Sequence, residues 1–544
     1  MQHRSTLSNV LCDLLLARGI KHVFGIPGDY VLGFFDSMVN SELSVINTCD
    51  EQGAGFAADA YARASGLGAV CVTYGVGGLK LVNSTAQAYA ERSPVVVISG
   101  APGVSEMTGE ALLHHRVRDF GTQLRIFEEI TVAQAVLNDP ASAYGEMTRV
   151  LNAAQRFKRP VYIEIPRDCA HLVIDTNAPH ATHVVGADTE TLAEAINEAL
   201  GLLNSAQRPI ILAGVEIHRF GLQDQLLKLI ERSGIRFATT IMGKSVVPET
   251  TAGFVGVYAG ILSEPSVRAA VEQSDCILNL GAMLTDLNTG IFTAQLDPSR
   301  MIVASADTLT IRRHHYAGIE LAQFLTALQS AGLNERGKLP ASTHANPSAF
   351  AAAIDRKITV SRVFECLDAE LPDDIVVVAD PGDALFGAMD LTMHLRSEFI
   401  SCAYYASLGF AVPACIGLQM AQPQWRPLVL VGDGAFQMTG IELSTAARYQ
   451  LTPIVVVLDN QGYGTERPML DGPFNDVHAW DIGRVTQLIG SGQAYSVDNE
   501  EEFVAAVRCA LADREQLAII HVHLAADDFS PALRRLTSTL SKRV

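Results

Sequence analysis

Short runs of apolar and β-branched residues alternate along the chain with longer segments of helix-forming residues. A strand buried in a parallel sheet is covered on both faces, so its apolar residues form a continuous run. In the first third of the chain such runs lie at 69–74, 94–100 and 160–168, and helical segments lie at 7–18, 53–65 and 80–92. This alternation predicts one doubly wound α/β domain over residues 1–170.

Two further domains are predicted beyond it. A polar linker at 171–190 is followed by predicted strands at 208–214, 236–241 and 276–282 and by helices at 192–203 and 222–233. These elements indicate a second α/β domain over residues 190–333. A linker at 334–356 then leads to a third domain over residues 357–544, which ends in a strand at 518–526. We therefore expect an α/β protein with three doubly wound parallel-sheet domains.

The strongest local pattern lies in the third domain, between residues 428 and 460. An apolar run at 428–431 stops at Gly432-Asp433-Gly434, a helical segment follows, and a second run at 453–458 ends before Asn460. A right-handed crossover would place both strands side by side, with Asp433 and Asn460 at the edge where open α/β sheets bind ligands. Two oxygen ligands beside flexible glycines suit a Mg²⁺ ion that holds a diphosphate. The alternative is an ordinary βαβ unit with a turn aspartate and a capping asparagine.

Composition narrows the class of protein. The chain has 544 residues, of which 48% are hydrophobic and only 18% charged, as in a large globular protein. Its formal charge of −19 argues against nucleic-acid binding, which requires clustered Lys and Arg. Nine scattered cysteines without a CxxC pair fit thiols in a reducing compartment and argue against a disulfide framework or a zinc site.

Targeting and nucleotide motifs are absent from the sequence. Asp13 interrupts the N-terminal apolar run, and no stretch approaches 18 uninterrupted apolar residues, so neither a signal peptide nor a membrane-spanning helix is expected. The glycines at 75–78 resemble a dinucleotide loop in part, but Lys80 replaces the third glycine of that motif. We expect a cytoplasmic protein.

Several separate segments carry a family resemblance that spans nearly the whole chain. They are GIPGDY at 25–30, Glu51, the pair His114-His115, GDG at 432–434 and Glu466. Together they resemble the thiamine diphosphate-dependent 2-keto acid decarboxylases, particularly indolepyruvate, phenylpyruvate and pyruvate decarboxylases. The resemblance implies pyrimidine-binding, middle and diphosphate-binding domains. It also implies decarboxylation of a 2-keto acid to an aldehyde and carbon dioxide through a thiamine ylide and an enamine, with thiamine diphosphate and Mg²⁺ as cofactors.

The same resemblance assigns roles to single residues. Glu51 would activate the aminopyrimidine, although a glutamate at a helix start also has a plain electrostatic reason to be there. The proton donors would be Asp29, His114, His115 and Glu466. The ligands of Mg²⁺ would be Asp433, Asn460 and the carbonyl of Gly462. Residues implied in cofactor binding are Glu51, Thr73, Asp383, Ala384, Ala406, Leu408, Asp433, Gly434, Ala435, Asn460 and Gly462.

The substrate pocket is also implied by the resemblance. Its lining would be Leu287, Pro381, Leu385, Phe386, Leu408, Thr465 and Met469, with help from a C-terminal helix near 533–540. Only one of these seven residues is aromatic, so the pocket should have room for a large apolar substrate such as phenylpyruvate or indolepyruvate. If Leu385 and Met469 instead packed together and closed the pocket, pyruvate would be preferred. The family further implies a homodimer or homotetramer with sites at the subunit interface.

Alternatives remain open at this point. An acetohydroxyacid synthase-like carboligase or a flavin-bearing oxidase would also carry the glutamate and the GDG–Asn pattern. A non-catalytic relative that binds the cofactor should have lost one of the five protonatable groups, and here all five are present. Two other histidine pairs, His314-His315 and His521/His523, are interpreted as surface and structural residues.

Overall fold

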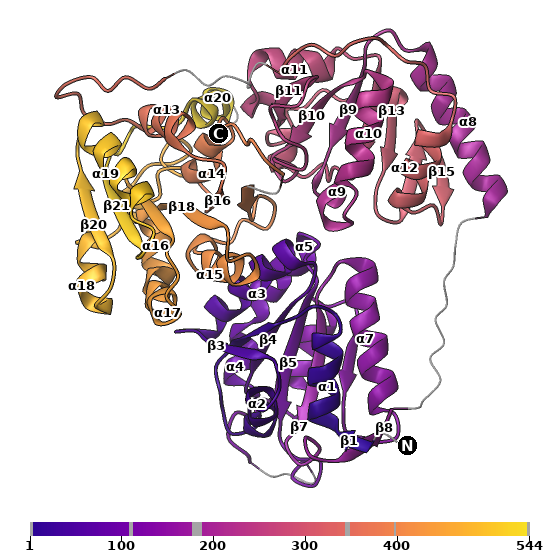
Figure 1. Cartoon of the computed structure of the whole chain (residues 1–544), viewed down its shortest axis with the longest axis vertical. Helices are drawn as coiled ribbons and strands as arrows, with labels where there is room; N and C mark the ends of the chain where they lie inside the picture. Colours follow the sequence, from indigo (N-terminus) through magenta and orange to yellow (C-terminus); the bar gives the residue numbers. More distant parts are fainter. Residues whose placement is uncertain (1–3, 108–111, 177–187, 343–348, 397–398, 541–544) are drawn as a thin grey trace. The chain divides into compact units, whose positions relative to one another are not determined.

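The computed structural model describes residues 4–107, 112–176, 188–342, 349–396 and 399–540 (Figure 1). The chain forms two compact units. The first consists of Met1–Thr182, Gly409–Pro427 and Thr439–Pro453, and the second consists of His183–Leu408, Leu428–Met438 and Ile454–Val544. Within the described ranges, no helix combines the length and the apolar character needed to cross a bilayer.

The first unit is built on a six-stranded sheet, in the order β3-β2-β4-β5-β7-β6, whose neighbouring strands all run parallel. The strands are β2 (His22–Gly25), β3 (Ser44–Asn47), β4 (Gly68–Val72), β5 (Val95–Ala101), β6 (Gln134–Val136) and β7 (Val161–Pro166). Every residue of β4, β5 and β7 is buried, which explains why their sequences are continuous apolar runs. A separate two-stranded sheet pairs β1 (Arg4–Thr6) with β8 (Val173–Asp175).

Helices cover both faces of this first sheet. They are α1 (Leu7–Leu16), α2 (Leu32–Val39), α3 (Glu51–Ser65), α4 (Val76–Lys80), α5 (Val82–Ala90), α6 (Thr122–Glu128) and α7 (Ala143–Phe157). Apolar residues of α1, α2 and α7 share one hydrophobic cluster with alternate residues of the strands. On the opposite face, Phe24 of β2 meets Tyr61 of α3, and Tyr162 of β7 stacks on Phe127 of α6. The first sheet is therefore doubly wound, as predicted.

Two helices from the last third of the chain also belong to the first unit. They are α15 (Ala411–Ala421) and α17 (Leu443–Arg448), which follows a short 3-10 turn, η4 (Gly440–Glu442). Helix α15 lies so close to α3 that a β-carbon on Gly417 would stand 1.9 Å from the carbonyl oxygen of Ala57. Only glycine fits there, because any side chain would collide with the backbone of α3.

The second unit contains the middle sheet, in the order β11-β10-β9-β12-β13-β14-β15. Its strands are β9 (Pro209–Ala213), β10 (Arg236–Thr240), β11 (Phe254–Tyr258), β12 (Cys276–Leu280), β13 (Met301–Ala304), β14 (Thr308–Ile311) and β15 (His314–Ala317). Five helices accompany them in the described part of the chain: α8 (Thr189–Ser205), α9 (Val215–Arg219), α10 (Gln223–Ser233), α11 (Pro265–Glu272) and α12 (Leu321–Ser330). Strand β14 pairs antiparallel with β13, and β15 pairs antiparallel with β14, so the middle sheet is parallel only up to β13.

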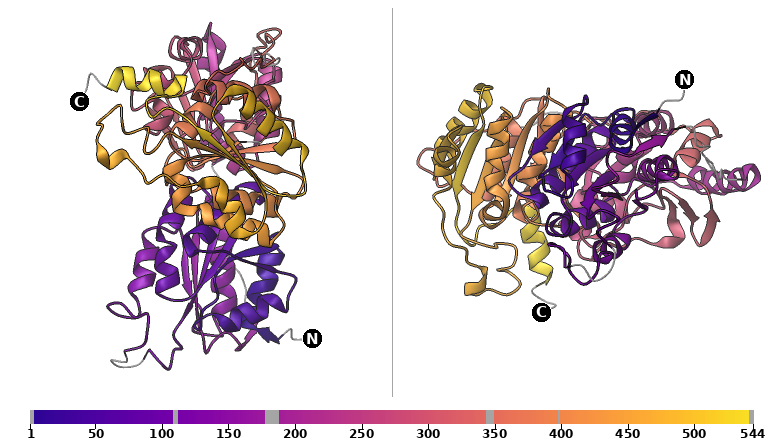
Figure 2. Two further views of the ribbon diagram at one scale, coloured as in Figure 1. Left: turned by 90° about the vertical axis from the view of Figure 1, so that its left-hand side faces the viewer. Right: turned by 90° about the horizontal axis from the view of Figure 1, so that it is seen from below.

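The third sheet, also in the second unit, has the order β17-β16-β18-β19-β21-β20. Its strands are β16 (Ile375–Ala379), β17 (Phe399–Ser401), β18 (Arg426–Gly432), β19 (Ile454–Asp459), β20 (Gln493–Val497) and β21 (Ala518–His523). Helices α13 (Val360–Glu370), α14 (Asp383–Ala388), α16 (Asp433–Thr439), α18 (Val485–Ile489), α19 (Glu500–Ala512) and α20 (Pro531–Leu540) accompany them. The strands fan out with the twist of an open sheet (Figure 2).

The first and third sheets share one topology. Numbered along the chain within each sheet, the six strands of both have the order 2-1-3-4-6-5. In each sheet the strand order reverses between two neighbours, β2 and β4 in the first and β16 and β18 in the third. Open α/β sheets bind their ligands at the carboxyl ends of strands beside such a reversal. The fold class is thus confirmed, and its topology predicts ligand binding at the carboxyl edges of the first and third sheets.

Candidate active site

At the edge of the first sheet, Asp29 lies close to both neighbouring histidines. Asp29 follows β2, and its Oδ2 atom is 2.8 Å from Nε2 of His114. The ring of Tyr30 stacks on His114 with 4.7 Å between the ring centres, and the ring of His115 meets that of His114 edge-on at the same distance. The carboxylate of Asp29 also lies 3.7 Å from Arg167. The structure therefore brings together three of the five predicted proton-transfer residues.

Glu51 lies at the start of α3, and its surroundings explain why the helix begins there. The side chain of Asp50 accepts a hydrogen bond from the backbone N–H of Gln52 and caps the helix. Glu442 of η4 is buried and accepts hydrogen bonds from the N–H groups of Cys49 and Asp50. Burial raises the pKa of Glu442. Sequence reasoning missed this residue, because its contacts join segments almost 400 positions apart.

The carboxylate of Glu51 has a cationic neighbour. Its Oε2 atom lies 3.1 Å from Nζ of Lys80, which also bonds Asp50. The side chain of Glu51 is 14% exposed, so one face remains accessible. The lysine that excludes a dinucleotide motif is therefore in direct contact with the predicted activating glutamate.

The turn at residues 75–78, which consists of Gly75 and the first turn of α4, contacts these groups. A β-carbon on Gly75 would stand 2.6 Å from the carbonyl oxygen of His115, and one on Gly77 would stand 3.5 Å from Oε1 of Glu51. Thr73 precedes the turn, and a β-carbon on Gly28 would collide with it at 2.4 Å. The hydroxyl of Thr73 is buried and, among the described residues, has no hydrogen-bond partner. Its hydrogen-bonding capacity is therefore unused within the described part of the chain.

The edge of the third sheet carries the predicted metal ligands. Asp433 and Asn460 directly follow the paired strands β18 and β19, and both are buried. The backbone is tightly folded here, because a β-carbon on Gly464 would stand 2.1 Å from Nδ2 of Asn460. At Gly462 the φ angle is +147°, and a β-carbon would collide with the carbonyl of Asn475 at 2.0 Å. Glycine is required at Gly462, where the obstacle is backbone, whereas a side chain at position 464 would displace the amide of Asn460.

Asp433 is electrostatically unsatisfied. Its Oδ1 atom is buried and has no hydrogen-bond partner within the part of the chain that the structure describes. Burial, together with the nearby charge of Asp459, raises the pKa of Asp433 to about 7. An isolated buried carboxylate is costly unless a cation or a proton neutralises it. The donor set of a carboxylate, an amide oxygen and a backbone carbonyl is the one that Mg²⁺ and Ca²⁺ prefer.

One pocket of about 470 Å³ joins this edge to an apolar wall. Of the predicted cofactor-binding and catalytic residues, it is lined by Asp383, Ala384, Ala406, Leu408, Gly434, Ala435, Asn460, Gly462 and Glu466. All seven residues predicted to line the substrate pocket are present, with Leu533, Leu536 and Thr537 of α20. Leu385 is buried and Met469 is exposed, and they do not close the space. Ile291 and Tyr463 also line the pocket, and the sequence analysis did not name them.

Two further residues predicted to bind the cofactor are Asp383 and Ala406. Asp383 starts α14, and its Oδ2 atom accepts a hydrogen bond from the N–H of Ser530. Burial raises the pKa of Asp383 to about 6. Ala406 has a φ angle of +57°, which is uncommon for a residue with a side chain and marks a constrained turn.

The two other histidine pairs are held by protein groups. In the third sheet, Nε2 of His521 lies 2.7 Å from Oδ2 of Asp459, and His523 bonds the hydroxyl of Ser496. In the middle sheet, His314 bonds Glu198 at 3.0 Å.

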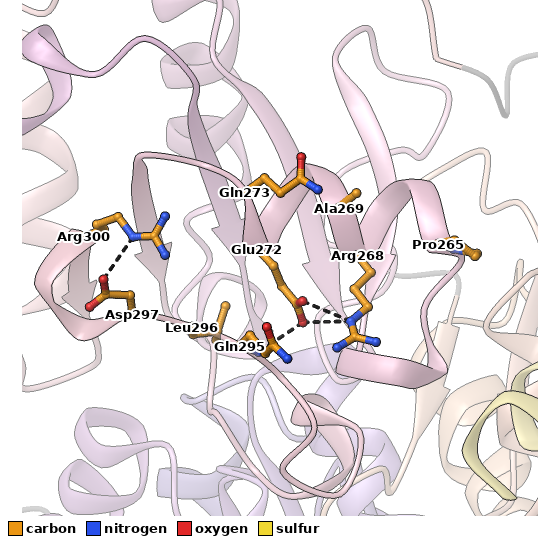
Figure 3. A pocket seen from close by; sticks show the side chains of 9 residues that line it. All are labelled: Pro265, Arg268, Ala269, Glu272, Gln273, Gln295, Leu296, Asp297 and Arg300. Carbon is orange, nitrogen blue, oxygen red and sulfur yellow. Dashed lines mark hydrogen bonds and ion pairs between the residues drawn. The ribbon is translucent and has the colours of Figure 1, made fainter. Parts of the chain in front are cut away.

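The middle sheet has a pocket of about 620 Å³ beside α11, but its charges are already matched. Figure 3 shows Arg268 directed toward Glu272, and Arg300 directed toward Asp297. The backbone N–H of Gln295 completes the group by donating to Glu272. The ionic groups of this pocket pair with each other, unlike Asp433 at the edge of the third sheet, whose Oδ1 atom has no hydrogen-bond partner among the described residues.

Comparison with known proteins identifies related chains. Three family models match in succession: thiamine pyrophosphate enzyme, N-terminal TPP binding domain, at residues 5–120; its central domain at 196–329; and its C-terminal TPP binding domain at 383–522. An indole-3-pyruvate decarboxylase of Azospirillum brasilense is 37% identical over 538 residues, which cover 97% of each chain. An alpha-keto-acid decarboxylase of Mycolicibacterium paratuberculosis is 33% identical over 529 residues, covering 95% of this chain and 94% of that one. Another, from Mycobacterium tuberculosis, is 31% identical over 98% of this chain and 97% of its own.

Proposed function

The chain belongs to the thiamine pyrophosphate enzymes, and we propose that it converts a 2-keto acid to an aldehyde and carbon dioxide without oxidation. The observation that carries this proposal is the pocket of about 470 Å³, in which the unsatisfied polar edge of the third sheet continues into an apolar wall that also bears Glu466. The names of the decarboxylases that match the chain over nearly its full length support the same reaction.

We further propose that Mg²⁺ and thiamine diphosphate bind at this edge. The buried Oδ1 atom of Asp433, which lacks a partner among the described residues, fits a divalent cation, and the pairing of β18 with β19 brings Asn460 and Gly462 to the same edge of the sheet. The bound cofactor would supply the carbon nucleophile and the electron sink that decarboxylation needs. The chain would position it through Leu408 and the carbonyl of Ala406, both of which line the pocket.

We assign proton handling to the carboxylates and histidines. Glu51 would share a proton with the N1′ atom of the aminopyrimidine, and its exposed face leaves room for that contact. Asp29, His114 and His115 lie within reach of one another and could hold and deliver a proton to the product carbon. Glu466 would act from the wall of the pocket.

We expect aromatic 2-keto acids to be preferred substrates. The walls of the pocket are mainly aliphatic, with a flexible Met469, and Phe386 is the only aromatic residue of the seven predicted to line it. Burying a phenyl or indole group there is worth about 2 kcal/mol or more, and burying a methyl group is worth much less. The kcat/KM for phenylpyruvate or indolepyruvate should exceed that for pyruvate by at least about tenfold.

The experiment is an aldehyde-release assay with pyruvate, a branched-chain 2-keto acid, phenylpyruvate and indolepyruvate, each with and without thiamine diphosphate and Mg²⁺. Aldehyde that forms only with both cofactors supports the proposal. A kcat/KM for pyruvate equal to or above the aromatic values refutes the substrate preference. A yellow protein that forms acetohydroxyacids instead of aldehydes refutes the reaction itself.

We propose a homodimer or homotetramer in which two copies complete each site. Exposed apolar residues along 469–480, namely Met469, Leu470, Phe474 and Trp480, support an interface in this region. If sites are shared, co-expressing the inactive variants Glu51→Gln and Asp433→Ala should restore about a quarter of wild-type activity, because half of the dimers are mixed and each has one intact site. Mixed oligomers without activity would contradict shared sites.

We also propose a cytoplasmic location. All nine cysteines lie in the described part of the chain, and none forms a disulfide, which fits a reducing compartment.

A further inference from the structure

Glu164 is a buried carboxylate that the proposed reaction does not use. It lies on β7, in the interior of the first sheet, and only 4% of it is exposed. Burial raises its pKa to about 7, although a hydrogen bond from Tyr162 lowers it in part. Burying a carboxyl group costs free energy unless hydrogen bonds stabilise it.

A single chain of hydrogen bonds leads away from Glu164. The hydroxyl of Tyr162 donates to Oε2 of Glu164 at 2.5 Å, and Nε2 of Gln123 donates to the Tyr162 oxygen at 2.7 Å. The same Nε2 donates to Oγ of Ser99 at 2.8 Å, and the hydroxyl of Ser99 donates a hydrogen bond to the carbonyl of Gly100. The side chains of Gln123, Tyr162 and Ser99 are all buried.

The chain ends on the glycine turn beside the candidate site. Oε1 of Gln123 accepts a hydrogen bond from the backbone N–H of Gly75 at 2.7 Å. Gly75 has a φ angle of +68°, and a β-carbon on Gly78 would stand only 2.3 Å from Oε1 of Gln123. The side chain of Gln123 therefore bonds Gly75 and packs closely against Gly78.

The hydrogen bonds have only one consistent direction. An N–H group of Gly75 can only donate, so the amide of Gln123 must present its oxygen there and its nitrogen to Tyr162 and Ser99. Tyr162 then accepts a hydrogen bond from Gln123, and its own hydroxyl donates to Glu164. Each group thereby fixes the orientation of the next, and such networks rigidify what they join.

The turn at 75–78 contacts two groups of the candidate site. The carbonyl of His115 packs directly against Gly75, and Oε1 of Glu51 lies against Gly77. A displacement of the turn would therefore move His115 and alter the space that Glu51 occupies. Misplacing reacting groups by about 1 Å can cost about 100-fold in rate.

We propose that Gln123, oriented by Tyr162 and Glu164, is a positioning residue that fixes the turn at 75–78 and, through it, the placement of Glu51 and His115. The proposal rests on the proposed function for the roles of those two residues. Gln123 itself touches neither substrate nor cofactor.

The test compares three variants of the full-length protein. Gln123→Met keeps the side-chain volume but removes all three hydrogen bonds, and Tyr162→Phe removes one hydroxyl. The control is Thr131→Val, which removes a buried hydroxyl after the end of α6 whose hydrogen bonds go to the carbonyl of Phe127 and from Gln134, and involve neither Gln123 nor Tyr162. For each variant, apparent Tm, backbone amide exchange of residues 73–80 without cofactor, KM, kcat and exchange of the thiamine C2 proton are measured.

Gln123→Met should accelerate amide exchange across 73–80 and slow C2-proton exchange and kcat by about 10–100-fold, with KM unchanged. Tyr162→Phe removes the hydrogen bonds with Gln123 and Glu164 but leaves Gln123 bonded to Gly75 and Ser99, so the loss should be smaller, about 3–10-fold. If Gln123→Met does not fold, Tyr162→Phe alone tests the proposal. Thr131→Val should lower Tm without changing either exchange rate.

Wild-type amide exchange and wild-type C2-proton exchange in both Gln123→Met and Tyr162→Phe would overturn the proposal, even if Tm fell. Equal losses in Thr131→Val would also overturn it, because the effect would then follow stability alone. If the wild-type protein neither binds thiamine diphosphate nor exchanges its C2 proton, the proposed function fails instead. Amide exchange at 73–80 would still decide whether Gln123 holds the turn.

Discussion

The first and third sheets have the same strand order but different chemistry at the edge where that order reverses. In the first sheet the charged groups are already paired: Asp29 with His114, and Glu51 with Lys80. In the third sheet the buried atoms Oδ1 of Asp433 and Oδ1 of Asp383 have no hydrogen-bond partner among the described residues. Burial raises the pKa of both carboxyls.

This difference indicates a division of labour. Paired groups at an accessible edge can exchange protons without first being neutralised, which suits general acid–base work. Buried oxygens without partners are stabilised by a cation, which suits the binding of a metal and a diphosphate. Under the proposed function, one topology would support two different tasks, and the loops that follow its strands would decide which task each sheet performs.

The largest expected effect is that of Glu51→Gln in the first sheet. The amide is nearly isosteric with the carboxylate but cannot hold the proton of N1′, so kcat should fall by about 10²–10⁴-fold. Aldehyde release at saturating cofactor measures it, with Glu42→Gln, an exposed glutamate of the same unit, as the control. Turnover close to wild type would remove Glu51 from the mechanism.

Asp433→Ala tests the third sheet. Wild-type protein should gain about 2.7 kcal/mol of stability when thiamine diphosphate and Mg²⁺ reach 100 times their dissociation constant, which is visible as a rise in apparent Tm. The variant should lose most of this rise, and EDTA should abolish it in the wild type. Asp481→Ala, an exposed aspartate of the same unit, should keep it. A full rise in Asp433→Ala would exclude this residue as a ligand.

Leu287→Trp tests the apolar wall. The larger side chain would fill part of the pocket of about 470 Å³. The kcat/KM for phenylpyruvate should therefore drop by about tenfold or more, and that for pyruvate should change much less. Steady-state kinetics with both substrates measure the ratio. Equal losses for both would mean that Leu287 does not line the part of the pocket that holds the substrate side chain.

The smallest effect concerns stability and pH. Burial raises the pKa of Glu164 from 4.5 to about 7, so the folded protein binds a proton that the unfolded chain releases. Its contribution to stability is therefore full below pH 4.5 and is lost as pH rises through 7. Glu164→Gln removes this loss, worth up to about 3 kcal/mol. Its apparent Tm relative to wild type should be several degrees higher at pH 8 than at pH 5, and an equal difference at both pH values would contradict the assignment.

Much of the fold could be predicted because its parallel strands are buried on both faces. The runs at 94–100 and 208–214 match β5 and β9 within one residue at each end. The start of α3 was placed two residues late, because the cap at Asp50 was not used. The antiparallel strands β14 and β15 were missed, since they are short and half-exposed. Nor could the sequence show that α15 and α17 belong to the first unit, because that depends on contacts between distant segments.

The candidate site divides in the same way. Residues within local motifs, such as Asp433 beside its glycines, could be proposed as candidates from spacing alone. Lys80, Glu442 and Gln123 could not, because each acts through a partner far along the chain or outside any motif. Their roles depend on distances that only the folded chain defines.

The most direct test of the division of labour measures thiamine diphosphate affinity and C2-proton exchange side by side in Glu51→Gln and Asp433→Ala. Calorimetric titration with Mg²⁺ gives the affinity, and proton exchange at saturating cofactor gives the activation. Glu51→Gln should keep near wild-type affinity and lose exchange. Asp433→Ala should lose affinity and keep exchange once the cofactor is saturating. Wild-type exchange in Glu51→Gln, or undiminished affinity in Asp433→Ala, would contradict this division of labour.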